Sequence, residues 1–146
     1  MKKLILILAA AALLPIAVVA RDANQMKYVG LLQVDDSGSA TGPAVDVSAY
    51  KGNAAFVVAW GLSSVAEYTG TVSITHCATA DGTYTTVTNL AGTAGTLTNT
   101  GVTTNKVDTF SCDLSRLHKY VKASLAEQNN ETNGVSVIMV APMKSE

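Results

Sequence analysis

The sequence predicts an all-β protein: a single antiparallel β-sandwich or jelly roll of about seven or eight strands, preceded by an apolar N-terminal segment. Three observations carry this prediction. After residue 20 the chain is rich in Thr, Ser, Gly and Val and holds only two Phe and one Trp, a composition that favours strands and turns. Several short runs alternate apolar and polar residues with a period of two. Turn residues separate these runs about every ten positions.

The first twenty residues form a segment of their own, so we divide the chain into 1–25 and 26–146. Lys2 and Lys3 precede an apolar run that ends in small residues at Ala20, as in a secretory signal peptide cleaved after that residue. The run also has the length of a short membrane anchor or of an apolar arm buried against other subunits. The sequence leaves these alternatives open, and a retained segment would allow contact with a membrane.

The charge balance argues against nucleic acid as a partner. Beyond residue 20 the chain carries 8 basic and 11 acidic residues, a formal charge of −3. A phosphate backbone is bound by a basic field, which this composition does not supply.

The first half of the domain predicts three strands. Residues 26–34 have strand composition and end at the turn-forming residues 35–39. Residues 45–51 form a short alternating strand that breaks at a corner ending in Gly52. Residues 53–62 are so continuously apolar that we expect a central strand with both faces covered, including Trp60 in the core.

The next stretch predicts a hairpin, the strongest local signal in the chain. Residues 69–78 and 83–88 alternate on either side of a turn that contains Asp81-Gly82. Val72, Ile74 and His76 should share one face of the first strand, and Ser73, Thr75 and Cys77 the other.

Residues 89–105 are rich in Thr, Gly and Asn and predict a long exposed loop, with an edge strand around Thr96–Thr98 as the alternative. Their hydroxyl groups could meet a partner surface, although a solvated connection is the ordinary role of such a loop. The candidate partner-contact residues in this loop and in the turn after the first strand are Asp35, Asp36, Ser37, Thr93, Thr96, Thr98, Thr100, Thr103 and Thr104.

Residues 107–125 predict a strand, a tight corner and a second strand, because two alternating runs flank the helical-turn-like 113–118. A polar turn then leads to a final strand at 135–141. The expected core includes Trp60, Val72, Ile74, Leu114, Leu117, Val121 and Val137.

No arrangement in the sequence predicts catalysis, so we expect a protein that is not an enzyme and needs no cofactor. The two histidines, His76 and His118, lie in no nucleophile motif. Cys77 and Cys112 lie in predicted strands, where either a disulfide or two buried free thiols would be ordinary. Neighbouring strand residues point to opposite faces, so His76 and Cys77 should not ligate one metal ion.

Three segments resemble a family of small β-sandwich proteins encoded among the structural genes of tailed bacteriophages. They are Val45-Asp46-Val47-Ser48-Ala49-Tyr50-Lys51-Gly52, the strand and turn from Val72 to Tyr84, and Asp113-Leu114-Ser115-Arg116-Leu117-His118-Lys119-Tyr120-Val121-Lys122-Ala123. The family has a similar V-D-L-S-A-Y-x-G start, a D-G-T-aromatic turn and a D-L-x-x-L-x-R-Y-V-R-A corner. This chain departs from the family in its apolar start and in Cys77, where Ser is more usual.

The resemblance implies a structural protein of the virion: a capsid decoration, cement or minor capsid protein. Such a protein is present in many copies or as a homo-oligomer and stabilises the particle through contacts with the major capsid protein. The signal-like start favours a second function class, a secreted or periplasmic β-sandwich that binds or adheres.

Overall fold

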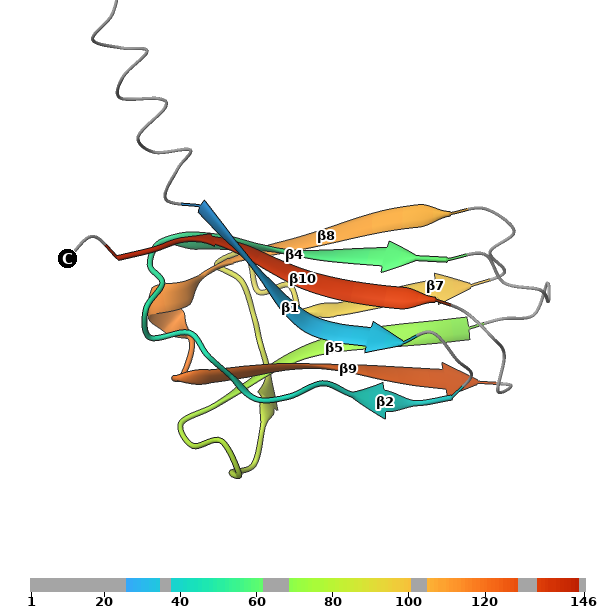
Figure 1. The fold of residues 1–146 in the computed structure, drawn as a ribbon, viewed down its shortest axis with the longest axis horizontal. Helices are drawn as coiled ribbons and strands as arrows, with labels where there is room; N and C mark the ends of the chain where they lie inside the picture. Colours follow the sequence, from blue (N-terminus) through green and yellow to red (C-terminus); the bar gives the residue numbers. More distant parts are fainter. Residues whose placement is uncertain (1–25, 35–37, 62–68, 101–104, 129–133, 145–146) are drawn as a thin grey trace, which may run out of the picture.

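The computed structural model describes residues 26–34, 38–61, 69–100, 105–128 and 134–144. These residues form two antiparallel sheets around one hydrophobic core (Figure 1). The strands are β1 (Met26–Val34), β2 (Ala40–Thr41), β3 (Val45–Asp46), β4 (Asn53–Trp60), β5 (Thr69–Cys77), β6 (Thr85–Thr86), β7 (Thr96–Thr100), β8 (Lys106–Asp113), β9 (Tyr120–Gln128) and β10 (Val135–Pro142). The predictions for residues 1–25 lie outside the described residues.

The first sheet has the order β1-β10-β4-β8, and the second has the order β2-β9-β5-β6, with β3 also paired to β9 and β7 to β5. The predicted β-sandwich is therefore confirmed. The described residues contain ten strands where we expected seven or eight. The strands predicted at 45–51 and 83–88 are present but shorter, as β3 and β6 with two residues each, and the two-residue strand β2 was not predicted because so short a pairing leaves no alternating pattern.

The core is the one that the alternation predicts, with one correction. Trp60, Val72, Ile74, Leu114, Val121 and Val137 are all buried. Leu117 is only partly buried. It lies just beyond the short 3-10 helix Leu114–Arg116, beside Val47 and Tyr50 at one end of the sandwich, and packs against the rim of the core.

The apolar strand β4 is central in the first sheet, as predicted, but the expectation that both its faces are covered is wrong. Its burial alternates along the strand, so Phe56 and Val58 are buried while Val57 is half-buried and Ala59 is exposed. The second sheet covers one side of β4 only. Beyond Asn53, the outward residues of β4 are Ala55, Val57 and Ala59, which are nevertheless apolar.

The strand, corner and strand predicted at residues 107–125 carry the chain from the first sheet to the second. β8 ends at Asp113, whose carboxylate accepts a hydrogen bond from the Ser115 amide at 2.9 Å and so caps the 3-10 helix. The Leu114 amide donates to the Gly52 carbonyl at 2.9 Å, which ties the corner to the chain entering β4. β9 then pairs with β5 along its whole length.

The predicted hairpin is present, since β5 pairs with β6 through Thr75–Thr86 and His76–Thr85. Of the two alternatives for residues 89–105, the edge strand around Thr96–Thr98 is the one observed, since Thr96–Thr100 forms the five-residue strand β7, which pairs with β5. Threonine is β-branched and suits a strand as well as a loop, so composition did not separate the two.

Candidate functional site

The three segments that carry the family resemblance meet at one end of the sandwich. β3 pairs with β9 through Val45–Val121 and Asp46–Tyr120. The Val47 amide donates to the Lys119 carbonyl at 2.9 Å, and Lys119 Nζ lies 3.3 Å from the Asp46 carboxylate. These contacts join the first segment to the third.

The second segment joins the same cluster through the outer face of β5. Lys122 Nζ lies 4.3 Å from the centre of the Tyr84 ring, a cation–π contact. The Tyr84 hydroxyl donates to the Ala80 carbonyl at 3.0 Å, which fixes the turn after β5. We call these joined segments the motif end.

The two histidines form a stacked pair in the motif end. Their ring centres are 4.8 Å apart, and the His118 amide donates to Nδ1 of His76 at 2.9 Å. Nδ1 must therefore be unprotonated to accept. Burial, and then the proximity of His118, lower the pKa of His76 from its ordinary value of 6.5. Because Nδ1 of His76 accepts this hydrogen bond, the role of this nitrogen is structural.

The two cysteines are both free and buried, so the structure does not pair them. Cys77 lies opposite Tyr120 on the outer face of the second sheet, packed against Gly82 of the turn that follows β5. Cys112 lies on β8, in the first sheet, and belongs to the core. Burial raises the pKa of the Cys112 thiol to about 11, which makes it a poor nucleophile at neutral pH.

The described part of the chain contains neither a metal-binding cluster nor a membrane-spanning helix. Its His, Cys, Asp and Glu side chains nowhere gather in threes as a metal ion would require. None of its helices has the length and apolar character to cross a membrane.

The outer side of the first sheet carries the most distinctive surface. Cross-strand pairing arranges twelve outward residues in three rows, each row crossing β1, β10, β4 and β8. None of the twelve is charged. In order across the sheet the rows are Tyr28, Val140, Ala55 and Ser111, then Gly30, Ile138, Val57 and Thr109, then Gln33, Ser136, Ala59 and Val107. We call these twelve residues the uncharged face.

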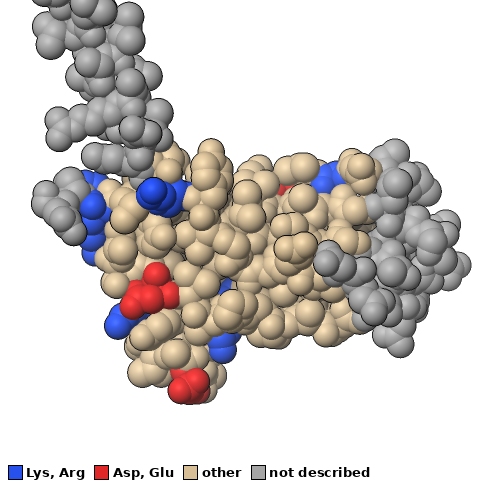
Figure 2. Space-filling view, viewed as in Figure 1, with Lys and Arg blue, Asp and Glu red and all other residues tan. Residues whose placement is uncertain are grey.

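The uncharged face exposes large apolar side chains. Tyr28 is 73% exposed and Val107 is 65% exposed, while Ile138 and Val57 in the centre are half-buried by their neighbours. In Figure 2 the surface over β1, β10 and β4 is mostly tan, and the charged side chains lie mainly toward the ends of the molecule. Contiguous apolar surface of this kind marks interaction sites in soluble proteins.

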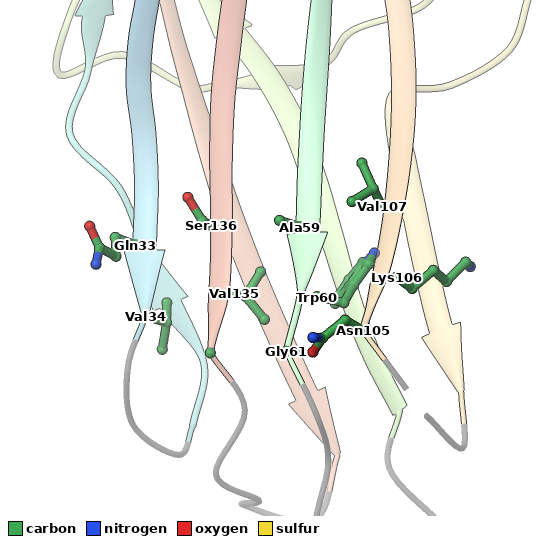
Figure 3. A pocket seen from close by; sticks show the side chains of 11 residues that line it. Gln33, Val34, Ala59, Trp60, Gly61, Asn105, Lys106, Val107, Val135 and Ser136 are labelled. Carbon is green, nitrogen blue, oxygen red and sulfur yellow. The ribbon is translucent and has the colours of Figure 1, made fainter. Parts of the chain in front are cut away.

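Figure 3 shows the last row of the uncharged face, with Gln33, Ser136, Ala59 and Val107 side by side on four neighbouring strands. These residues form one side of an open depression at the end of the sheet. Trp60 lies below them and donates from Nε1 to the Asp108 carboxylate at 2.9 Å. Lys106 contacts the same carboxylate oxygen at 2.9 Å, so the charge of Asp108 is neutralised within the sheet.

A second exposed feature is a rigid turn that presents Leu90, 80% exposed. The Asn89 side-chain oxygen accepts from the amides of Ala91 at 3.0 Å and Thr93 at 2.9 Å. The Asn89 amide donates to the Thr93 carbonyl at 3.0 Å. Gly92 has a φ of +80°, which a glycine adopts without strain. The turn backbone is therefore held by hydrogen bonds, and the Leu90 side chain is exposed to water.

The candidate partner-contact residues beside this turn are exposed as predicted: Thr93, Thr96, Thr98 and Thr100. Asp35, Asp36, Ser37, Thr103 and Thr104 lie outside the described residues. Leu90 is not among the predicted contact residues, although a lone Leu after Asn and shortly before Gly is the signal of such a turn. The uncharged face was not predicted either, and its signal in the sequence is the largely apolar character of β4 and β10.

No protein-family model matches the chain, and no curated protein matches it. Among solved structures, the SPBc2 prophage-derived protein YomS is similar with a TM-score of 0.52 at 14% identity, over 80% of this chain and 91% of that one. This likeness shows the fold. The Eiger TNF of S. frugiperda has a TM-score of 0.48 at 8% identity, over 83% and 93% of the two chains. A Bacillus endospore appendage protein has a TM-score of 0.44 at 11% identity, over 82% and 88%.

Proposed function

We propose that this chain is a non-enzymatic structural protein of a tailed-phage particle, of the capsid decoration, cement or minor capsid type. It is located in the virion and stabilises the particle by contacts with coat subunits. The observation that carries the proposal is the motif end. The three segments that resemble the phage family are far apart in sequence, yet they join in one cluster through the Asp46–Lys119 and Lys122–Tyr84 contacts. A prophage-derived protein with the same fold adds support.

The coat contact is made by the turn around Leu90 and the threonines beside it. Leu90 is exposed on a turn whose backbone is held by four hydrogen bonds within residues 89–93, so the turn loses little backbone conformational entropy on binding. Interfaces concentrate their binding energy on such anchors. Thr93 in the same turn, and Thr96 and Thr98 on β7, supply exposed hydroxyl groups that donate and accept hydrogen bonds.

Rebinding to particles tests this proposal. Purified chain is mixed with particles of the encoding phage that lack it, and the bound fraction is measured after sedimentation. Leu90→Asp should lower the affinity at least about tenfold. Thr86→Asp, which also introduces an aspartate at an exposed position, on β6, should leave the affinity unchanged. If the wild-type chain does not bind, the proposed function fails. If Leu90→Asp binds like the wild type, the assignment of the contact to this turn fails.

The second candidate function, a secreted or periplasmic binding or adhesive domain, is favoured by the signal-like start at Lys2, Lys3 and Ala20. It requires a mature chain that begins at Arg21 and is found outside the particle. The intact mass of the natural protein separates the two candidates.

A further inference from the structure

We propose that an extended segment of a coat subunit adds as a further strand to the open edge of β8, beside the Leu90 turn. This inference rests on the proposed function and deepens it, because it states which kind of coat segment this part of the molecule recognises. Three observations carry it: the direction of the backbone groups of β8, the continuity of this edge, and the place of the Leu90 turn.

The open edge of β8 carries a regular row of backbone groups. β8 lies at one edge of the first sheet, and within the described residues it pairs with β4 alone (Figure 1). The Leu114 amide donates to the Gly52 carbonyl at 2.9 Å. Because hydrogen bonding alternates along an antiparallel pair, this bond places the even-numbered residues of β8 in the ladder with β4. The amides and carbonyls of Val107, Thr109 and Ser111 therefore point away from the sheet.

The other sheet edges are short or interrupted, whereas β8 is continuous. β1 is broken by a register shift near its middle, and the strands at the edges of the second sheet have two to five residues. Short strands and bulges protect an edge from strand addition. β8 pairs over eight residues without a register shift and contains no proline. Its charged residues Lys106 and Asp108 contact each other at one end, and residues 109–112 carry no charge.

The Leu90 turn lies at the far end of this edge from Lys106. Leu90 and Ala91 line a depression together with Ser111 and Cys112 of β8. Leu90 itself is 80% exposed. A strand that bonds to the outward groups of β8 ends at this depression, where it can place an apolar side chain against Leu90.

These features identify an extended polypeptide as the ligand. Outward amides and carbonyls recur along β8 at every second residue, about 6.8 Å apart, and the backbone of another extended chain complements this spacing. In strand addition the backbone hydrogen bonds supply affinity, and pockets for side chains supply specificity. The segment therefore has strand-forming residues and one large apolar side chain that meets Leu90. Since the Leu90 turn is the proposed coat contact, the segment belongs to a coat subunit.

Proline substitution at an outward-pointing amide tests the inference. Thr109→Pro removes an N–H that makes no bond to β4, so the sandwich should still fold, which circular dichroism and urea unfolding would check. In the rebinding assay with particles that lack the chain, this variant should have an affinity at least about tenfold lower than the wild type. Thr109→Ala is the matched control, because it also loses the hydroxyl group but keeps the amide, and it should bind like the wild type.

Hydrogen–deuterium exchange of the wild type gives a second readout that needs no variant. The outward amides of Val107, Thr109 and Ser111 should exchange rapidly in the free chain and slowly in the chain bound to particles. Mass spectrometry of peptides that cover β8 would compare the two states. Ser111→Pro removes the next outward amide and repeats the affinity test if Thr109→Pro does not fold.

The outcomes separate this inference from the proposed function. If Leu90→Asp weakens binding but a folded proline variant binds like the wild type, the inference is overturned and the proposed function stands. Exchange in β8 that particle binding does not slow would overturn the inference as well. So would exchange that slows in the free chain as its concentration rises, since this would assign the edge to a second copy. A wild type that does not bind particles overturns the proposed function and this inference with it.

Discussion

The surroundings of His76 make the stability of the folded protein depend on pH. Its Nδ1 accepts from the His118 amide, and protonation at that nitrogen would replace an acceptor with a donor that faces another donor. In the folded protein, burial first and the nearby His118 second lower the pKa of His76. A group with a lowered pKa stabilises the fold above its unfolded pKa, and this contribution is lost as the pH falls toward the folded value.

We predict that the free energy of unfolding falls as the pH drops below the ordinary His76 value of 6.5. Urea unfolding at about pH 7.5 and about pH 5 measures it. His76→Asn is the control, because its side-chain oxygen can still accept from the His118 amide but does not titrate. The acid-induced loss should be smaller in this variant; an equal loss in both proteins would show that other groups cause it.

Leu117 and Leu125 provide a matched comparison of two leucines in the same corner-and-strand unit. Leu125 is 2% exposed, so Leu125→Ala should lower the free energy of unfolding by about 2–5 kcal/mol. Leu117 only lines the rim of the core, and Leu117→Ala should cost no more than about half of that. Chemical unfolding of the two variants measures both values. Equal losses would contradict the rim position of Leu117.

At the scale of the elements, Gly42 controls how closely the link between β2 and β3 approaches the rest of the sandwich. Its amide donates to the Ala123 carbonyl at 2.9 Å, and a Cβ at this position would overlap the carbonyl oxygen of Leu31. Two backbone segments therefore lie against this glycine, one in each sheet.

Gly42→Ala should destabilise the protein by about 1–3 kcal/mol or more, because backbone must move to admit the methyl group. Gly30→Ala is the control, since an added Cβ there meets nothing within 4 Å, and it should change stability by less than about 0.5 kcal/mol. Thermal or urea unfolding of both variants provides the measurement. A Gly42→Ala protein as stable as the Gly30→Ala protein would mean that the segments are not packed this closely.

The elements differ in how far the sequence predicts them, and the reason is the range of the interactions that form them. β5 with its Asp81-Gly82 turn and the corner capped by Asp113 depend on neighbours in the chain, so local pattern was sufficient. The strand β7 depends on pairing with β5, and its threonines fit a loop equally well. The rows of the uncharged face depend on the strand order β1-β10-β4-β8, which no local pattern contains.

The candidate contact residues show the same difference between features set by local sequence and features set by distant contacts. The exposed threonines at 93, 96 and 98 could be predicted from composition. The exposure of Leu90 depends on the hydrogen bonds that Asn89 makes. The apolar residues of β4 predicted a strand with both faces covered, whereas in the structure Val57 and Ala59 lie on an open face. An apolar residue that faces outward has the same appearance in sequence as one that faces a core, and only the partner strands separate the two.

At the scale of the whole molecule, the sandwich presents three distinct regions. The motif end contributes packing and surface charge, including the exposed ion pair of Asp46 and Lys119. The Leu90 turn exposes one large apolar side chain, and the uncharged face exposes Tyr28 and Val107.

The amount of this chain in purified particles tests the central claim most directly. Particles of the encoding phage, banded in a density gradient, would be analysed by quantitative mass spectrometry against the major capsid protein. We predict that the chain bands with the particles in many copies per particle. Its absence from the particles, together with a mature form beginning at Arg21 in the periplasmic or secreted fraction, would contradict the account.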